Sequence, residues 1–405
     1  MSTAHKRLSR PEFIAGIAML FATIAFTIDA MLPALPDIGR ELSPLDLNKA
    51  QLIVTSFVLG MGVGTFFTGP LSDAWGRRPI ILGGAAIYIC ASFVAWQAQN
   101  LEVMLAARFF QGLGAAGPRV ASVAIVRDLY EGRQMAKIMS FVMMVFMLVP
   151  TIAPTLGAGI IAISSWRGIF VAYILFSIAT ASWVFFRQGE THPVARRTPL
   201  KAKPLWAAIR EVFSHKMVLY SIFLQVLLTG NLFAALSSTQ QIFDVTFSQG
   251  HNFHLWFGFI AILASTASMV NAALVVRFGM RKLASIAIGG QLAYSLIMLI
   301  MTWQGWWPEA LYFPAYVLWQ ISVFFMVGMT AGNINALAME PVGHIAGMAA
   351  SIISAVATIF GAMIAIPIGL MFNGTPLPLI TAVTCTGLLS FFAIRAMSKL
   401  ERKTT

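Results

Sequence analysis

Charged residues are scarce in this sequence. Of its 405 residues, 10% are charged and 58% are hydrophobic, whereas about 25% of residues are charged in a typical soluble domain. So few charges cannot cover the surface of a soluble globule of this length, and the high apolar content excludes a disordered chain. Only two cysteines are present, Cys90 and Cys385, both in apolar runs, so we expect no disulfide framework and no thiolate metal site. What remains is a polytopic membrane protein.

Twelve apolar runs are long enough to cross a membrane as helices, which requires about 20 residues each. They lie near residues 13–35, 50–71, 80–98, 102–126, 136–161, 168–186, 217–240, 253–276, 283–303, 310–337, 347–370 and 377–397. The runs are too long for membrane-spanning β-strands and do not alternate as those strands do. The sequence therefore predicts an all-α integral membrane protein with 12 transmembrane helices. The first run lacks a cleavage site, so we expect an uncleaved span rather than a signal peptide.

A basic, proline-containing segment at residues 187–216 divides the predicted spans into two groups of six. The groups resemble each other, because Gly-Arg-Arg at 76–78 follows the second span and Gly-Met-Arg-Lys at 279–282 follows the eighth. We therefore predict two pseudo-symmetric halves: an N-terminal six-helix half at 1–186, a cytoplasmic linker at 187–216 and a C-terminal half at 217–405. Internal duplication is typical of secondary transporters, whose substrate site lies between the repeats near the membrane midplane.

The basic residues follow the predicted loops. With the N-terminus inside, 22 of the 27 Lys and Arg residues lie in cytoplasmic segments and three lie in external loops. The positive-inside rule then places both termini in the cytoplasm. The same distribution accounts for the net charge of +12 without a nucleic-acid partner, which a basic protein often has. We expect a monomeric, multi-pass protein of the inner (cytoplasmic) membrane whose partners are the lipid bilayer, protons and a small-molecule substrate.

Three charged side chains lie within predicted spans: Asp29 in the first, and Arg108 and Arg119 in the fourth. Charges at such positions are costly and commonly functional. Asp29 and Arg108 each lie seven residues from the external end of their span, which places both about 10 Å below the same surface. An apolar environment favours the protonated carboxyl, and a nearby guanidinium favours the carboxylate. A change in the distance between the two groups would thus alter proton affinity, although a structural ion pair is the alternative.

The loop after the second predicted span has a distinctive string, Gly69-Pro-Leu-Ser-Asp73-Ala-Trp-Gly76-Arg77-Arg78-Pro79. It resembles the loop signature of the major facilitator superfamily, whose fold has two six-helix halves. The resemblance implies a cytoplasmic latch composed of Gly69, Asp73, Gly76, Arg77, Arg78 and Asp128. In that latch Asp73 would face residues 343–347, and Arg77 would reach Asp128.

Further motifs are similar to those of the twelve-span drug:proton antiporters, in particular the branch of bicyclomycin- and chloramphenicol-resistance exporters. They are Asp29-Ala-Met-Leu-Pro33, Arg108-Phe-Phe-Gln111-Gly112, Pro150-Thr-Ile-Ala-Pro154-Thr-Leu-Gly157 and Glu340-Pro-Val-Gly343-His-Ile-Ala-Gly347. The resemblance implies that Asp29 and Arg108 couple transport to protons, and that Pro150, Pro154 and Gly157 belong to the helix typical of antiporters. The fifth-span motif departs from the family pattern at two glycine positions, which are alanines here.

Polar and aromatic residues within spans are also candidates for contact with substrate. The predicted cavity residues are Asp29, Arg119, Phe146, Asn231, Gln241 and Asn333. Polar side chains in spans usually face the bundle interior, although they also form hydrogen bonds between helices. The string Gly112-Leu-Gly114-Ala-Ala-Gly117 matches a dinucleotide fingerprint, but no strand precedes it, so we predict that its small residues allow close helix packing.

The sequence therefore predicts a proton-coupled secondary transporter that exports small amphiphilic compounds, such as drugs and antibiotics, by drug:H+ antiport with alternating access. It would use the proton gradient as its energy source and need no cofactor or metal. No nucleophile–base pair or metal cluster is apparent, so we do not expect an enzyme. A dedicated metabolite exporter and a substrate:H+ symporter are alternatives with the same fold. A channel or a non-transporting scaffold is an alternative of another class.

Overall fold

The structure is a computed structural model that describes residues 8–198, 200 and 202–401. These residues form helices and connecting turns, without a strand in the described part. Eleven continuous helical runs are long and apolar enough to cross a membrane, and the longest, Glu309–Leu370, contains two helices joined by a short 3-10 turn. The described residues therefore contain twelve long helices, and the predicted all-α membrane class is confirmed.

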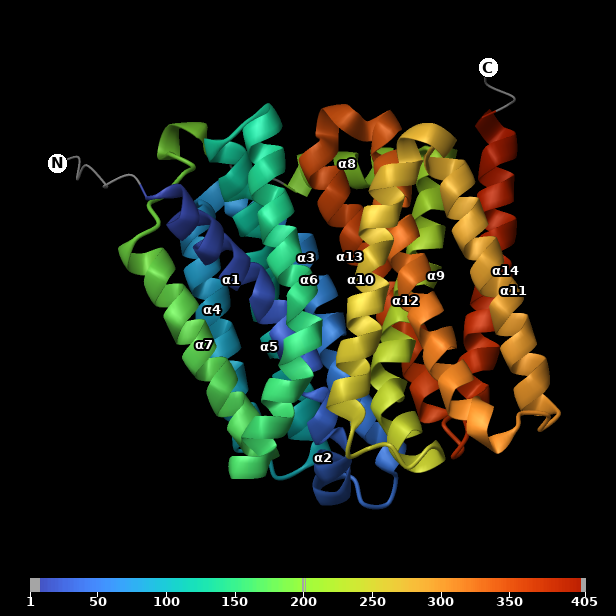
Figure 1. Ribbon diagram of the computed structural model, residues 1–405. Helices are drawn as coiled ribbons and strands as arrows, with labels where there is room; N and C mark the ends of the chain where they lie inside the picture. Colours follow the sequence, from blue (N-terminus) through green and yellow to red (C-terminus); the bar gives the residue numbers. More distant parts are fainter. Residues whose placement is uncertain (1–7, 199, 201, 402–405) are drawn as a thin grey trace. The chain divides into compact units, whose positions relative to one another are not determined.

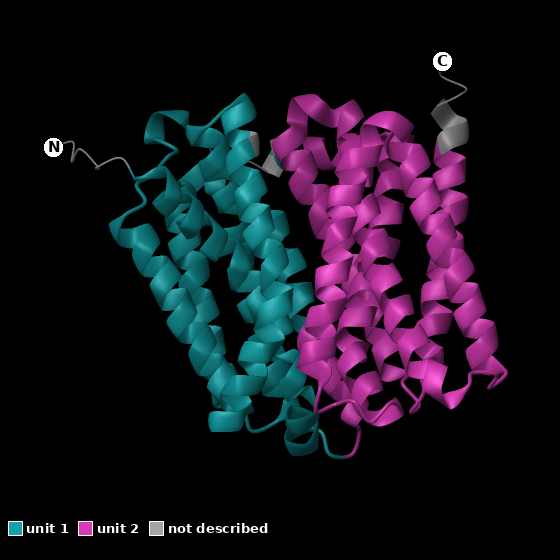
Figure 2. Cartoon of the chain, viewed as in Figure 1, with its two compact units in different colours: residues 1–44, 56–205 teal, residues 45–55, 206–405 magenta. Residues whose placement is uncertain are grey.

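Two compact units make up the chain (Figure 2). Unit 1 consists of Met1–Pro44 and Ser56–Leu205, and unit 2 consists of Leu45–Thr55 and Trp206–Thr405. The boundary between residues 205 and 206 falls inside the predicted linker. Residues 45–55, which the sequence assigns to the first half, group with unit 2 instead.

Six long helices make up most of unit 1 and run side by side (Figure 1). They are α1 (Arg10–Asp29), α3 (Leu52–Trp75), α4 (Arg77–Trp96), α5 (Leu101–Leu129), α6 (Gly132–Ile163) and α7 (Trp166–Phe186). The 3-10 turn η1 (Leu32–Ala34) and the short helix α2 (Leu35–Leu42) follow α1, and the 3-10 turn η3 (Val194–Arg196) follows α7. The 3-10 turn η2 (Leu47–Gln51), directly before α3, belongs to unit 2. The first turn of α3 belongs to unit 2.

Unit 2 contains the other six long helices (Figure 1). They are α9 (Lys216–Gln241), α10 (Phe253–Phe278), α11 (Met280–Trp303), α12 (Glu309–Met339), α13 (Ala346–Leu370) and α14 (Leu377–Glu401). The amphipathic helix α8 (Ala202–Ser214) precedes them, the π-helical segment η4 (Ile242–Thr246) follows α9, and the 3-10 turn η5 (Glu340–Ile345) joins α12 to α13.

The same pairs of helices pack together in the two units. The first long helix contacts the fifth and sixth, as α1 contacts α6 and α7, and α9 contacts α13 and α14. The third contacts the fourth and sixth, as α4 contacts α5 and α7, and α11 contacts α12 and α14. This repetition confirms the two pseudo-symmetric six-helix bundles that the repeated Gly-Arg-Arg and Gly-Met-Arg-Lys loops predict.

Glycine determines both the turns and the closest helix contacts. Gly76 and Gly279 have φ angles of 106° and 81° at the turns that precede α4 and α11, where other residues rarely fit. A Cβ atom at Gly112 of α5 would overlap the carbonyl oxygen of Phe57 in α3. The prediction that the glycines of the fourth span allow close packing is therefore confirmed.

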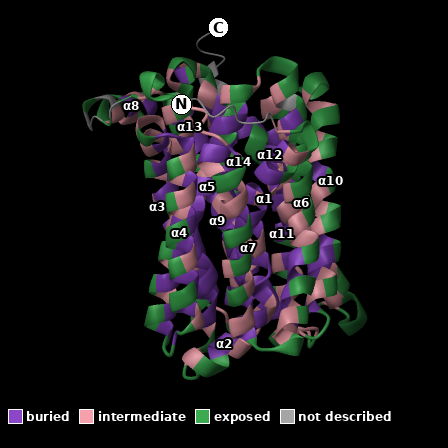
Figure 3. Cartoon of the chain, turned by 90° about the vertical axis from the view of Figure 1, so that its left-hand side faces the viewer, coloured by how far each residue is buried: buried purple, intermediate pink, exposed green. Residues whose placement is uncertain are grey.

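Apolar side chains cover much of the outer surface of the bundles. Figure 3 shows exposed residues along the outward side of helices such as α4 and α7, with buried residues behind them. Many of the exposed residues are large and hydrophobic, including Leu175 and Ile178 on α7. In a bilayer, lipid chains solvate such a surface, so this arrangement fits a membrane protein.

Candidate functional site

A buried polar cluster surrounds Arg108 in unit 1. The Arg108 side chain is 0% exposed. Its Nη2 donates to the carbonyl oxygen of Thr27 at 3.3 Å, and its Nη1 donates to Oε1 of Gln111. The guanidinium also lies 4.7 Å from the ring centre of Phe57. Burial of a cation requires such partners, and here they come from α1, α3 and α5.

Two tyrosines complete this cluster. The hydroxyl of Tyr173 on α7 donates to the Thr27 carbonyl at 3.0 Å, and the hydroxyl of Tyr88 on α4 lies 2.5 Å from Thr27 Oγ1. Both tyrosines are fully buried. They were not predicted from the sequence, because a single tyrosine within an apolar run carries no local signal of its partners on other helices.

Asp29 is the last residue of α1 and is 4% exposed. Arg108 binds the carbonyl oxygen of Thr27, two residues earlier in the chain. The structure therefore brings the helices of Asp29 and Arg108 together at one level of unit 1. The role of Asp29 and Arg108 in proton coupling stays a prediction.

The fifth-span motif lies on α6 beside the end of α1. Pro154 and Gly157 are buried, and Pro150 is partly buried. A Cβ atom at Gly157 would overlap the carbonyl oxygen of Ala30, the residue after Asp29. Glycine at this position therefore allows α6 to pack closely against the chain next to Asp29. The motif's role in antiport stays a prediction.

Arg119 and Phe146 belong to other parts of unit 1. Arg119 lies eleven residues after Arg108 on α5 and is half-buried. The ring of Phe146 on α6 packs edge-on against Phe21 of α1, with 6.3 Å between ring centres, next to the apolar core of unit 1. Their contact with a substrate stays a prediction.

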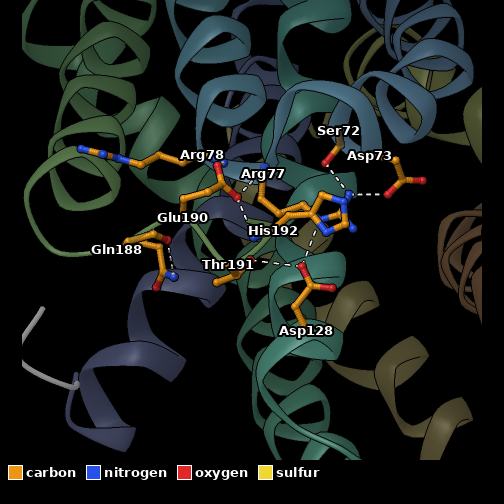
Figure 4. A network of polar contacts seen from close by, with 10 residues as sticks. Ser72, Asp73, Arg77, Arg78, Asp128, Gln188, Glu190, Thr191 and His192 are labelled. Carbon is orange, nitrogen blue, oxygen red and sulfur yellow. Dashed lines mark hydrogen bonds and ion pairs between the residues drawn. The ribbon is translucent and has the colours of Figure 1, made fainter. Parts of the chain in front are cut away.

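The predicted latch residues gather where α3 ends and α4 begins (Figure 4). The Arg77 side chain is 3% exposed. Its Nη1 lies 2.5 Å from Asp73 Oδ1 and 3.0 Å from Ser72 Oγ, and its Nε lies 3.0 Å from Asp128 Oδ2. The contact between Arg77 and Asp128 that the resemblance implies is therefore confirmed. The approach of Asp73 to residues 343–347 stays a prediction.

The other latch residues have simpler surroundings. Gly76 has the positive φ angle described above. Arg78 donates from Nη2 to the carbonyl oxygen of Phe185 on α7, and its guanidinium lies 5.1 Å from the centre of that ring. Gly69 is half-buried near the end of α3. These residues thus shape and anchor the loop around Arg77.

Residues of the predicted linker form hydrogen bonds with the latch residues (Figure 4). The carboxylate of Glu190 accepts hydrogen bonds from the backbone N–H groups of Arg77 at 3.0 Å and Arg78 at 3.1 Å. The hydroxyl of Thr191 donates to Asp128 at 3.1 Å. A carboxylate at a helix N-terminus stabilises the exposed N–H groups and the helix dipole. Glu190 was not predicted from the sequence, although it is one of only two acidic residues in the basic linker at 187–216.

Two predicted cavity residues form hydrogen bonds between helices of unit 2. The hydroxyl of Thr386 on α14 donates to Oδ1 of Asn231 on α9 at 2.6 Å. Nδ2 of Asn333 on α12 donates to Oδ1 of Asn271 on α10 at 2.7 Å. Such bonds hold helices together in a membrane, and the place of both residues in a substrate cavity stays a prediction.

Hydrogen bonds of amide side chains attach residues 45–55 to the rest of unit 2. Nε2 of Gln51 donates to Oε1 of Gln241 at 2.6 Å and to the carbonyl oxygen of Gly369 at 3.1 Å. Nε2 of Gln241 donates to Oδ1 of Asn48 at 2.7 Å, and Ser238 donates to Gln51 Oε1 at 2.9 Å. The predicted cavity residue Gln241 thus belongs to a hydrogen-bonded group at one end of unit 2.

Twelve membrane-length helices in two repeated bundles, with buried charged residues inside one bundle, define the class of secondary membrane transporters. Residues 15–394 match the Major Facilitator Superfamily, and the chain belongs to this family. The protein is therefore a multi-pass membrane transporter of small molecules and not an enzyme.

Among curated proteins, the chain is similar to a bicyclomycin resistance protein homolog from Haemophilus influenzae. The two are 30% identical over 390 residues, which cover 94% of each chain. The multidrug resistance protein MdtL from Escherichia coli is 32% identical over 205 residues, which cover 50% of this chain and 52% of MdtL. The predicted similarity to the drug-exporter branch is confirmed by these relatives.

Solved transporter structures share the fold. The xylose transporter XylE from Escherichia coli, in a partially occluded inward open conformation, has a TM-score of 0.72 at 12% identity, over 95% of this chain and 96% of XylE. The nucleoside transporter NupG has a TM-score of 0.73 at 14% identity, over 95% of this chain and 99% of NupG. At these identities the likeness establishes the major facilitator fold.

Proposed function

We propose that the protein is a proton-coupled exporter of small amphiphilic compounds, antibiotics among them, that works by drug:H+ antiport with alternating access. The observation that carries this proposal is the buried carboxylate of Asp29 at the end of α1, beside the Arg108 cluster. The names of relatives, a bicyclomycin resistance protein homolog and a multidrug resistance protein, support drugs as substrates. The proton gradient supplies the energy, and no cofactor takes part.

Coupling requires that Asp29 bind its proton with different affinity in the two states of the carrier, because a ligand shifts an equilibrium only by its differential affinity. Arg108 is tied to the carbonyl of Thr27 on the helix that carries Asp29. A shift of α1 against α5 would therefore change the electrostatic field of the guanidinium at the carboxylate. A proton that binds Asp29 from outside favours the return to the inward-facing state, and its release inside prepares the next export step.

The proposal includes a location and a topology. The protein resides as a monomer in the inner membrane with both termini in the cytoplasm. This orientation follows from the 22 basic residues in the predicted cytoplasmic segments, among them Arg77 and Arg78 in the latch loop.

A susceptibility panel provides the first test. Cells with and without the protein are exposed to antibiotics and cationic dyes, and an exporter raises the inhibitory concentration of its substrates. Resistance to several unrelated compounds supports multidrug export, whereas protection against a single compound indicates a dedicated exporter.

The Asp29→Asn variant tests the coupling in everted membrane vesicles. A compound identified in the panel should release protons from the acidified lumen of wild-type vesicles, measured with a pH-sensitive dye. Asparagine has no proton to exchange, so we expect the substrate-induced signal to fall at least about tenfold. Glu102→Gln is the control, because Glu102 is an exposed carboxylate in the first turn of α5 and should retain the wild-type signal.

Two outcomes would contradict the proposal. If Asp29→Asn retains full proton-driven transport, the carboxylate is not the coupling group. If the compound instead acidifies the lumen further, substrate and proton move together, and the protein is a symporter.

A further inference from the structure

Several buried polar atoms of unit 2 have no hydrogen-bond partner among the described residues, and two of them lie on the helix α12. They are the hydroxyl of Tyr316 and the side-chain carbonyl oxygen, Oε1, of Gln320, and both side chains are 0% exposed. The two residues lie one turn apart on α12 and therefore share a face of this helix. Buried polar atoms are nearly always hydrogen-bonded, so two such atoms one turn apart on the same face are candidates for contact with a bound molecule.

Contacts with α9 fix the orientation of the Gln320 amide. Nε2 of Gln320 donates to Oγ1 of Thr239, and that hydroxyl donates in turn to the carbonyl oxygen of Ala235. A hydroxyl has a single proton to donate, so Thr239 can only accept from the amide. The Oε1 atom of Gln320 is therefore directed away from Thr239, and it can only accept a hydrogen bond.

Aromatic rings surround Tyr316. Its ring centre lies 6.0 Å from that of Phe243, 5.2 Å from Phe247 and 5.6 Å from Trp319. The indole N–H of Trp319 already donates to Ser295. None of these residues is charged. Small-molecule sites combine an apolar, aromatic lining of this kind with a few polar groups that orient the ligand.

The chain leaves α9 through the π-helical segment η4, which carries Phe243. π-helical turns are rare and occur frequently at functional sites. Phe247 follows directly after this segment, so a local change in η4 would move both phenylalanine rings relative to Tyr316. Such a movement would admit a ligand to side chains that are closed to solvent in this structure, while α9 and α12 stay packed together.

Tyr316 has the same register in unit 2 as Arg108 has in unit 1. Each lies seven residues after the first residue of the fourth long helix of its unit, Leu101 in α5 and Glu309 in α12. The position in unit 1 holds a cation near the buried Asp29, and the position in unit 2 holds a neutral hydroxyl. The repeated fold thus provides a charged cluster in one bundle and a neutral cluster in the other.

We propose that Tyr316 and Gln320 form a binding site for a small, neutral, ring-containing molecule with a hydrogen-bond donor beside an acceptor, as in an amide. The ligand N–H donates to Oε1 of Gln320, its carbonyl oxygen accepts from the hydroxyl of Tyr316, and its ring packs against Phe243 and Phe247. The proposal that this ligand is also the exported compound rests on the proposed export function. The proposal of the binding site itself does not depend on that function.

Acetanilide and phenyl acetate test the site as a matched pair of probes. Acetanilide is an aromatic amide with an N–H group, and phenyl acetate has an ester oxygen in its place. Binding to the purified full-length protein in lipid nanodiscs is measured by saturation-transfer NMR, without a proton gradient. Dissociation constants on the order of millimolar suit ligands of this size. We expect acetanilide to bind about five- to tenfold more tightly, which corresponds to one hydrogen bond.

Three variants assign the contacts. Gln320→Met removes the acceptor, so acetanilide should bind only as tightly as phenyl acetate. Tyr316→Phe removes the hydroxyl and keeps the ring, so both probes should lose affinity by the same factor. Tyr312→Phe is the matched control, because it removes a hydroxyl one turn earlier on α12, and both probes should bind it as they bind the wild type.

The proposal is overturned if the wild type binds the two probes equally. It is also overturned if Gln320→Met and Tyr316→Phe bind acetanilide as the wild type does, which is the result expected when the two groups hold only a buried water. The comparison of probes on the wild type requires no variant to fold. If the wild type binds acetanilide more tightly than phenyl acetate but the vesicles show no substrate-induced proton flux, the binding site is supported and only the export proposal fails.

Discussion

At the scale of single residues, Arg77 shows what a buried cation in the latch requires. Its guanidinium is 3% exposed and contacts the carboxylates of Asp73 and Asp128 and the hydroxyl of Ser72. A planar guanidinium can serve several oxygen atoms at once, whereas the ammonium of lysine is a compact point charge on a flexible stem. The positive charge alone is therefore not sufficient at this position.

We predict that Arg77→Lys lowers the stability of the protein although it conserves the charge. Loss of the forked contacts leaves one carboxylate poorly paired, which we expect to cost about 1–3 kcal/mol. The apparent midpoint of thermal unfolding, measured by intrinsic fluorescence in detergent, should fall. Arg78→Lys is the control, because Arg78 binds a single carbonyl and an aromatic face. Equal midpoints for both variants would show that the network around Arg77 adds no stability.

Residues with a motif around them were predictable, and residues defined only by tertiary contacts were not. The pairing of Arg77 with Asp128 followed from the resemblance of the latch loop to a family signature. Tyr88, Tyr173 and Glu190 escaped prediction, because their hydrogen-bond partners lie on other helices or more than a hundred residues away. A hydroxyl in an apolar run looks the same in the sequence whether it binds a neighbouring helix or nothing.

At the scale of helices, runs of apolar residues predict spans well but predict their ends less well. The first run was expected at 13–35, whereas α1 ends at Asp29 and η1 and α2 continue the segment to Leu42. Pro33 and Pro36 have no backbone N–H to donate, so the regular α-helical pattern is interrupted there. Hydropathy reports which residues avoid water, and it carries no information on backbone hydrogen bonds. The π-helical segment η4 was not predicted for the same reason.

Glycines on α6 permit a matched test of helix packing. A Cβ atom at Gly157 would overlap the carbonyl oxygen of Ala30, whereas one at Gly159 would meet no atom within 4 Å. We expect Gly157→Ala to destabilise the protein by about 1–3 kcal/mol, as overpacking does, and to slow transport. Gly159→Ala should leave both unchanged. Thermal unfolding and vesicle transport measure the two effects, and indistinguishable variants would mean that α6 can move away from α1 at no cost.

At the scale of the whole molecule, the sequence predicted the duplication, but it did not predict the unit to which every residue belongs. The repeated glycine turns before α4 and α11 predicted two similar bundles, and the pairs of packed helices repeat accordingly. Residues 45–55 nevertheless group with unit 2. Their amide hydrogen bonds to the rest of unit 2 join positions 187 or more residues apart, such as Gln51 and Gln241. No local composition or periodicity encodes such a contact.

Membrane orientation is also a property of the whole molecule, and two glutamines permit a matched test of it. Gln99 lies in the turn between α4 and α5, Gln134 lies in the first turn of α6, and both are exposed. The positive-inside distribution places Gln99 outside and Gln134 in the cytoplasm. Gln99→Cys and Gln134→Cys are each introduced after Cys90 and Cys385 have been replaced by alanine.

A membrane-impermeant maleimide should label Gln99→Cys in intact spheroplasts and should label Gln134→Cys only after the membrane is permeabilised. Because an odd number of spans separates the two positions, the labels must differ in any twelve-helix arrangement of this kind. Labelling of Gln134→Cys alone would therefore retain the fold but invert the protein. Inversion would place the Arg77 latch outside and would contradict the export direction, since protons would then reach Asp29 from the wrong side of the membrane.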